Sequence, residues 1–264
     1  MISEITLSYI SILFQVVMLA VMLAFSVRLI GKSERSLTSA FLTFFYALCL
    51  LTDLYWVIYV FMRPDTRMPF AANEIGEAAI TLLAAAILRS AVHSPYNVSI
   101  GCLVGTGLFS VCNIALWITW SGEVVQDILV GITFAYLLYS IAVSIKVSRA
   151  FKRYMWIITG TACALLVVLQ GATFIVPENL KSIPDTCAYI VMTAMIIFLA
   201  FVLISSWKRH MSAEALLCDV FALFGFALTS VYMSEGLWYL LFQVCETVSF
   251  LLILLSVRKV VDRK

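Results

Sequence analysis

The sequence has little charge. Only 12% of its 264 residues are Asp, Glu, Lys or Arg, whereas a soluble domain usually carries about 25%. Apolar and aromatic residues make up 63% of the chain, and the mean hydropathy is +1.06. So few charges cannot cover the surface of a water-soluble protein of this size, but a surface in contact with lipid needs none. The composition therefore predicts an integral membrane protein with the lipid bilayer as its surroundings.

Histidine and paired cysteine are scarce as well. The only two histidines, His93 and His210, lie in joins between apolar runs, which argues against a haem held inside the membrane. The seven cysteines form no C-x-x-C pair, and the H-E-x-x-H, G-x-S-x-G and P-loop motifs are absent. The net charge of +2 does not indicate a nucleic-acid partner. We therefore expect no cofactor, no metal site, no nucleic acid and no enzymatic activity.

Long apolar runs fill most of the chain. A membrane-spanning helix needs about 20 mostly apolar residues, and short joins containing proline or charge separate the runs. We expect nine transmembrane helices, at about 9–30, 39–62, 71–92, 98–120, 126–145, 154–176, 186–207, 215–233 and 237–257. The number falls to eight if the weakest join, 234–236, does not separate two spans. Because every join is short, residues 1–264 are expected to form a single transmembrane domain without an extramembrane domain.

Positive charge is unevenly divided between the two sets of joins. If the N-terminus lies outside, the external joins hold only Arg63, Arg67 and Lys181. The chain has 17 Lys and Arg residues, so 17 − 3 = 14 lie on the cytoplasmic side. Cytoplasmic joins of membrane proteins are enriched in these residues. The sequence therefore predicts an all-α polytopic helix bundle with its N-terminus outside and its C-terminus inside, in a plasma or bacterial inner membrane.

Polar side chains within the apolar runs are the main candidates for function. A charged residue at the centre of a spanning helix costs roughly 2.5–3.5 kcal/mol on insertion scales. At about 1.5 Å of rise per residue, most of these acids and amides fall in the external half of the bilayer. One interpretation is an acidic ligand-binding pocket that opens to the outside. The alternative is that each group only forms hydrogen bonds between helices. The predicted ligand-binding residues are Asp53, Trp56, Tyr59, Glu74, Glu77, Asn113, Gln243 and Glu246.

The spacing of three of these residues suggests the class of ligand. Asp53, Trp56 and Tyr59 follow an i, i+3, i+6 pattern, which places them along one flank of a helix. An acid beside aromatic rings favours a cation or an amine, through charge and through the ring face. Glu246 has no basic residue near it in the sequence. It is therefore expected to be protonated, paired with another helix, or functional.

Other patterns are also consistent with a structural role. Glu74 and Glu77 are three residues apart and could pair with Arg63 and Arg67, which would fix the hairpin between the second and third spans. Asp219, near the inner end of its span, is expected to pair with Lys208 or Arg209 or to reach the membrane interface.

Small residues form a further pattern in the fourth span. Gly101 and Gly105 lie four residues apart, and Gly107 follows shortly after. Such spacing allows helices in membranes to approach each other closely. We interpret it as a site of helix packing inside the protein.

The first seven predicted helices resemble the N-terminal multi-helix sensor regions of bacterial membrane histidine kinases. The likeness covers about residues 8–207 and lies in the layout. It consists of an external N-terminus, an aromatic-rich second span from Phe41 to Met62, a short external turn, and a third span that ends in Arg89. It implies ligand sensing. No kinase domain follows within the 264 residues, so the resemblance implies output through a cytoplasmic or membrane signalling partner.

Two functions therefore remain open. The first is binding or sensing of a small ligand, with a cation as one class, and signalling through a partner. The second is proton-coupled secondary transport of a small molecule, with Glu246, Asp53 and Glu77 carrying protons. Many transporters are built from repeated halves with broken helices, and no repeat or mid-span proline is visible here. The sequence therefore favours sensing.

Overall fold

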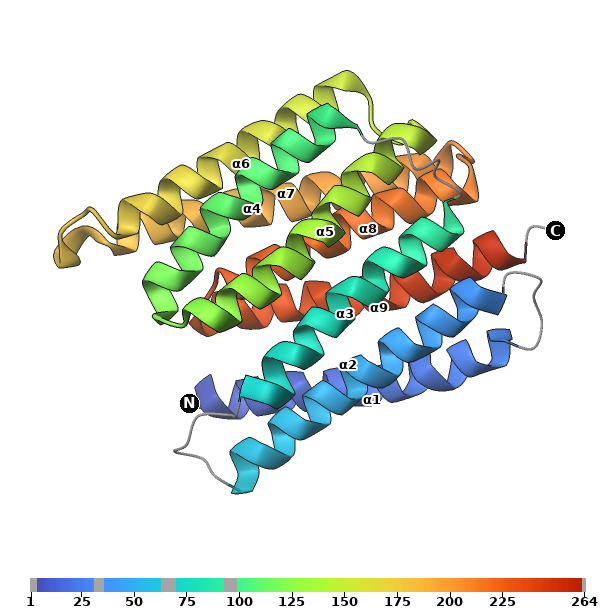
Figure 1. Cartoon of the computed structure of the whole chain (residues 1–264), viewed down its shortest axis with the longest axis horizontal. Coiled ribbons are helices and arrows are strands. Elements are labelled where there is room, and N and C mark those ends of the chain that lie inside the picture. The colour runs from blue at the N-terminus through green and yellow to red at the C-terminus, as the bar shows by residue number, and fades with distance from the viewer. Residues whose placement is uncertain (1–3, 31–35, 63–69, 93–98, 263–264) are drawn as a thin grey trace.

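The computed structural model describes residues 4–30, 36–62, 70–92 and 99–262 (Figure 1). This part of the chain is helical and contains no strand. The elements are α1 (Glu4–Ile30), α2 (Ser36–Met62), α3 (Phe70–Ala91), α4 (Ile100–Ser121), α5 (Val124–Ser148), α6 (Arg153–Thr173), the 3-10 turn η1 (Glu178–Leu180), α7 (Ser182–Lys208), α8 (Ala213–Tyr232) and α9 (Gly236–Val261). Each predicted span corresponds to one α-helix, so the predicted all-α bundle is confirmed.

Eight helices of the described chain are long and apolar enough to cross a bilayer, and the chain is a multi-pass membrane protein. Both α8 and α9 belong to this set. They are separated at the short join that the sequence marks as weakest, where Gly236 has a positive φ of 58°. The helix outside the set is α3, which carries Glu74 and Glu77 in its first two turns. Its 22 residues still extend about 33 Å at 1.5 Å per residue, and it packs between α2 and α5.

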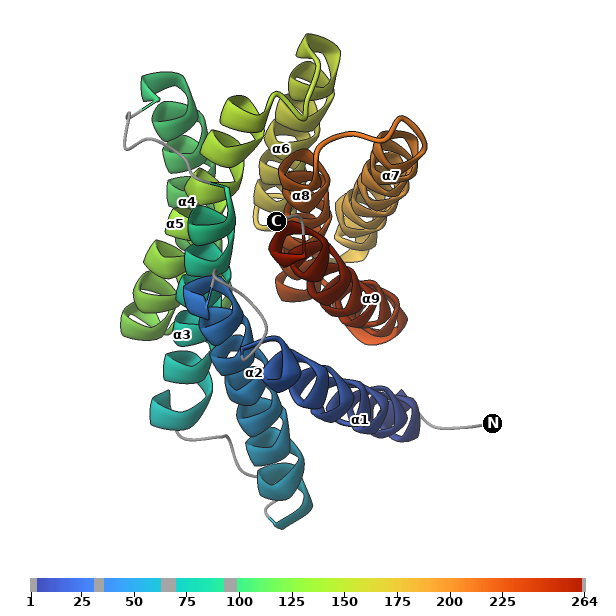
Figure 2. The ribbon, with the colours of Figure 1, turned by 90° about the vertical axis from the view of Figure 1, so that its right-hand side faces the viewer.

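The helices form two rings that share a wall (Figure 2). In the first ring, α1, α2, α3, α5, α8 and α9 contact one another in this order, and α9 closes the ring against α1. In the second ring, α4, α6 and α7 continue from α5 round to α8. The shared wall is thus α5 and α8, and α8 is the most completely buried helix of the molecule.

A buried aromatic cluster joins α2 to the α8–α9 hairpin. The ring centroid of Phe45 lies 5.7 Å from that of Phe250 and 6.2 Å from that of Phe224, both edge to face. Such pairs add about 0.5–1.5 kcal/mol beyond their buried area. The Tyr46 hydroxyl donates a hydrogen bond to the Phe250 carbonyl oxygen at 2.7 Å. These contacts fix the distance between α2 and α9, the two helices that contribute most to the functional site.

The odd-numbered helices finish at one end of the bundle, where α6 and α8 begin (Figure 1). Basic residues gather in these helix ends, so we call this the cationic end. Its described basic residues are Arg28, Arg89, Lys146, Arg149, Lys152, Arg153, Lys208, Arg209, Arg258 and Lys259. The opposite end carries Lys181 as its only described Lys or Arg. The positive-inside rule assigns the cationic end to the cytoplasm, and this orientation stays a prediction.

Glycine permits close helix contact, but not at the predicted positions. A Cβ added to Gly225 on α8 would lie 2.8 Å from the Cδ1 of Ile141 on α5, so the shared wall depends on this glycine. A Cβ added to Gly101, Gly105 or Gly107 on α4 would meet no heavy atom within 4 Å. The predicted packing role of these glycines is therefore wrong. Gly101 and Gly105 line an open groove between α4, α5, α6 and α8 instead.

Candidate functional site

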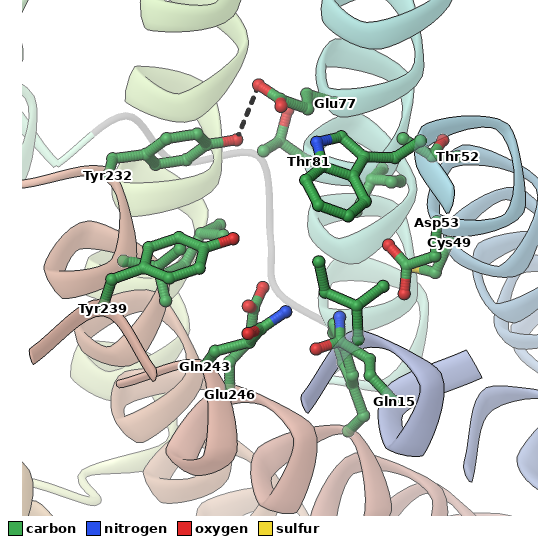
Figure 3. A pocket seen from close by; sticks show the side chains of 16 residues that line it. Gln15, Cys49, Thr52, Asp53, Glu77, Thr81, Tyr232, Tyr239, Gln243 and Glu246 are labelled. Carbon is green, nitrogen blue, oxygen red and sulfur yellow. Dashed lines mark hydrogen bonds between the residues drawn. The ribbon is translucent and has the colours of Figure 1, made fainter. Parts of the chain in front are cut away.

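Three intramembrane acids line one cavity in the first ring (Figure 3). Asp53 comes from α2, Glu77 from α3 and Glu246 from α9, and the cavity has a volume of about 190 Å³. We call it the acidic chamber. It is lined by Ile12, Gln15, Cys49, Thr52, Asp53, Trp56, Glu77, Ile80, Thr81, Leu228, Val231, Tyr232, Tyr239, Gln243, Glu246 and Phe250. Among these described lining residues there is no Lys, Arg or His.

One face of α2 supplies the predicted acid and one of the two predicted aromatic residues. The lining positions are 49, 52, 53 and 56, an i, i+3, i+4, i+7 pattern that defines a single helix face. Asp53 and Trp56 therefore lie together. Tyr59 does not line the chamber, although it lies about two helical turns after Thr52; its ring instead stacks on that of Tyr55, with centroids 5.9 Å apart.

One face of α9 lines the chamber in the same way. Tyr239, Gln243, Glu246 and Phe250 follow an i, i+4, i+7, i+11 pattern, and all four line the cavity. The predicted residues Gln243 and Glu246 are thus brought to the same place as Asp53. Tyr239 was not predicted, although its spacing from Gln243 and Glu246 is the signal that could have found it.

Hydrogen bonds between α1 and α9 hold two carboxamides at the chamber wall. The Ser11 hydroxyl donates to Oε1 of Gln243 at 2.7 Å, and the Thr247 hydroxyl donates to Oε1 of Gln15 at 3.0 Å. Because each carboxamide oxygen is engaged, the NH₂ group of each side chain remains to donate elsewhere. The Gln15 side chain also lies beside the Asp53 carboxyl group (Figure 3).

Glu77 is connected to the last residue of α8. The Tyr232 hydroxyl donates a hydrogen bond to Oε2 of Glu77 at 3.1 Å (Figure 3). The Tyr232 ring is held by aromatic neighbours, with centroid distances of 5.6 Å to Trp117 and 6.1 Å to Phe134. Glu77 therefore has a fixed position on one side of the chamber, facing α2 and α9.

The chamber concentrates negative charge away from water. Glu246 is only 8% exposed and interacts electrostatically with both Asp53 and Glu77. Oδ2 of Asp53 is buried and makes no hydrogen bond within the described chain. Burying carboxylates close to one another costs free energy unless positive charge offsets them. The arrangement is therefore suited to take up positive charge, and the aromatic side chains of Trp56 and Tyr239 line the same cavity.

The remaining predicted residues lie elsewhere. Asn113 is buried on α4 in the second ring, and its Nδ2 donates to the carbonyl oxygen of Phe109 in the same helix at 2.8 Å. It does not line the acidic chamber. The side chain of Glu74 lies outside the described residues, as do Arg63 and Arg67. The alternative pairing of these arginines with Glu74 and Glu77 therefore falls outside the described residues as well.

Asp219 is a fourth buried acid, separate from the chamber. It is 1% exposed on α8, toward the cationic end. Neither of its carboxyl oxygens makes a hydrogen bond within the described chain, and the expected ion pair with Lys208 or Arg209 is absent. Ser206 on α7 is a polar neighbour. Asp219 lines none of the cavities described in this structure, which makes it a natural control for the chamber acids.

The described residues contain no group of three or more His, Cys, Asp or Glu side chains arranged to hold a metal ion. No protein-family model, curated protein or solved structure matches the chain. The chemistry of the acidic chamber is therefore the basis for any statement about function.

Proposed function

We propose that the acidic chamber binds a small organic cation, such as an amine, from the outer side of a plasma or bacterial inner membrane. The protein would sense this ligand and signal through a partner protein. The observation that carries the proposal is that Asp53 and Glu246 share one cavity whose described lining includes no basic side chain. Buried charges are usually paired or offset by a bound ion, and a cationic ligand would supply the missing charge.

Electrostatics favours a cation strongly over a neutral ligand. Two opposite unit charges 4 Å apart attract by about 4 kcal/mol at the effective dielectric constant of about 20 that describes protein sites. An uncharged ligand of the same shape gains none of this. Trp56 and Tyr239 line the same cavity, and a desolvated cation–π contact with either ring would add about 2 kcal/mol.

The size of the chamber limits the ligand. Its volume of about 190 Å³ corresponds to about six water molecules, at about 30 Å³ for each in the liquid. A short alkylamine or diamine fits this space, whereas most drug-sized cations do not.

The position of the chamber favours sensing. It lies between the N-terminal helices α1–α3 and the C-terminal hairpin α8–α9. Both α8 and α9 connect the chamber with the cationic end, where Arg258 and Lys259 lie in the last turn of α9. A cation that draws Asp53 and Glu246 together would shift α9 relative to α2, and a rigid helix carries such a shift along its length. The resemblance to histidine-kinase sensor regions supports the same direction of signalling.

Titration calorimetry of the protein in lipid nanodiscs tests the binding. A series of linear alkylamines is compared with the corresponding alcohols, which have the same shape without the charge. We expect amines to bind and alcohols not to bind. Asp53→Asn and Glu246→Gln each remove a charged partner worth about 1.5–3 kcal/mol, so each should weaken binding about 10- to 150-fold. Asp219→Asn removes a buried charge outside the chamber and should change the affinity less than twofold. Equal binding of alcohols, or equal effects of all three variants, would contradict the proposal.

A second candidate is proton-coupled transport of the same cation. It is favoured by the electrostatic interaction between Glu246 and Asp53, because acids that hold either a proton or a cation, but not both, can couple two fluxes. Liposomes containing a pH-sensitive dye distinguish the two functions. An amine gradient that drives proton movement, lost in Glu246→Gln, would establish transport. Amine binding without proton movement would support sensing and exclude proton-coupled transport.

A further inference from the structure

A second cavity lies in the second ring, and we call it the apolar groove. Its volume is about 790 Å³, within the range of about 300–1,000 Å³ for small-molecule sites. The wall is formed by α4, α5, α6 and α8 with Leu199 of α7, and most of its side chains are apolar. It shares no lining residue with the acidic chamber, so the two sites can be tested independently.

One end of the groove is cationic. Lys146, in the last turn of α5, lines it there and donates a hydrogen bond from Nζ to Oγ of Ser99 at 2.8 Å. Phe151 and Trp156 line the same end, with ring centroids 5.7 Å apart. A lysine beside aromatic rings is typical of the interface between lipid headgroups and hydrocarbon. This end therefore offers an ammonium and a hydroxyl to an anion, next to an apolar channel.

Glycine keeps the apolar groove open. A Cβ added to Gly101, Gly105 or Gly160 would meet no heavy atom within 4 Å, although all three lie inside helices and line the groove. Glycine in a helix interior costs about 0.5–1 kcal/mol relative to alanine. Neither close helix contact nor a positive φ accounts for glycine at these positions. Each lies where a larger side chain would occupy the groove.

The groove is long enough to span the hydrocarbon of one leaflet of a bilayer. Along α4 it extends from Ser99 to Cys112, about 20 Å at 1.5 Å per residue. One leaflet contributes about half of the roughly 30 Å of hydrocarbon. A chain whose head lies at Lys146 would therefore run in the groove through the depth of its own leaflet.

We propose that the apolar groove holds an acyl chain of an anionic phospholipid from the leaflet at the cationic end. The lipid phosphate would lie against Lys146 and Ser99. The charge of Lys146 selects an anionic headgroup, and the glycine-lined wall accepts the chain.

Native mass spectrometry of the full protein, released from nanodiscs of equal phosphatidylglycerol and phosphatidylcholine, tests this proposal. We expect the wild type to retain phosphatidylglycerol in preference to phosphatidylcholine. Gly105→Leu and Gly160→Leu would fill the groove and remove the retained lipid, with unchanged amine binding in the acidic chamber. Gly107→Leu on α4 and Gly171→Leu on α6 are matched controls. Their added side chains also start in open space, but they do not line the groove, so lipid retention should be unchanged.

The headgroup has its own test. Lys146→Gln should lower the preference for phosphatidylglycerol about fivefold, the factor expected for one lysine near an anionic lipid. Gly105→Ala offers a milder version of the filling test, because alanine favours the helix and should leave the melting temperature at or above that of the wild type. Equal retention of both lipids by the wild type, or equal loss in the filling variants and their controls, would overturn the proposal.

Discussion

The hydrogen bond between Tyr232 and Glu77 gives a prediction whose size follows from the structure. Tyr232→Phe removes only the hydroxyl that lies 3.1 Å from Oε2 of Glu77. The ring contacts to Trp117 and Phe134 remain, because phenylalanine keeps the ring. Hydrogen bonds between helices in membranes average about 0.6 kcal/mol, with a maximum near 1.7, and bonds to charged groups are worth about 1.5–3. We expect a coupling free energy of about 1–2 kcal/mol between the two side chains.

A double-mutant cycle measures this coupling. The free energy of unfolding in mixed micelles is followed by circular dichroism for the wild type, Tyr232→Phe, Glu77→Met and the double variant. Tyr46→Phe replaces Tyr232→Phe in a control cycle, because the Tyr46 hydroxyl donates to the carbonyl of Phe250 instead of Glu77. Independent sites add within about 0.3–0.5 kcal/mol. A Tyr232–Glu77 coupling within that range, or one equal to the control, would refute the proposed role of Tyr232 in positioning Glu77.

Two further predictions concern packing and orientation. Gly225→Ala places a methyl group 2.8 Å from Cδ1 of Ile141 and should lower the free energy of unfolding by about 1–3 kcal/mol. Ile141→Val deletes that Cδ1 atom and should restore most of the lost stability in the double variant. A failure to rescue would show that the shared wall packs differently. A cysteine introduced at Lys181 should react with a membrane-impermeant maleimide on intact cells, whereas one at Lys152 should react only after the membrane is opened. The reverse pattern would contradict the predicted orientation.

The helices were predictable because short polar joins separate long, mostly apolar runs, although α3 falls outside the set that is apolar enough to cross a bilayer. The faces of single helices were partly predictable. Gln243 and Glu246 on α9 line the chamber, as predicted from polar side chains inside an apolar run. Helical spacing from these two residues also identifies Tyr239 as a lining residue. Tyr59 was misplaced because helical spacing does not show how far along α2 the cavity extends, and its lining ends at Trp56, one turn before Tyr59.

The arrangement of the helices was not predictable from one sequence. Gln15 lines the chamber because α1 packs against α9, at the other end of the chain. Asn113 lies away from it because α4 belongs to the second ring, although its depth in the membrane is similar. Depth follows from the sequence at a known rise per residue, but the neighbours of a helix depend on packing between distant segments. Local periodicity does not record such packing.

The central claim is that the acidic chamber accepts a positive charge. Gln243→Lys tests it most directly, because a tethered ammonium takes the place of an unidentified ligand. A buried lysine without a partner costs several kcal/mol, and Asn113→Lys, at a buried site outside the chamber, should lower the melting temperature accordingly. We predict that Gln243→Lys melts no lower than the wild type and no longer binds alkylamines. A loss of stability equal to that of Asn113→Lys, or amine binding at wild-type affinity, would contradict the account.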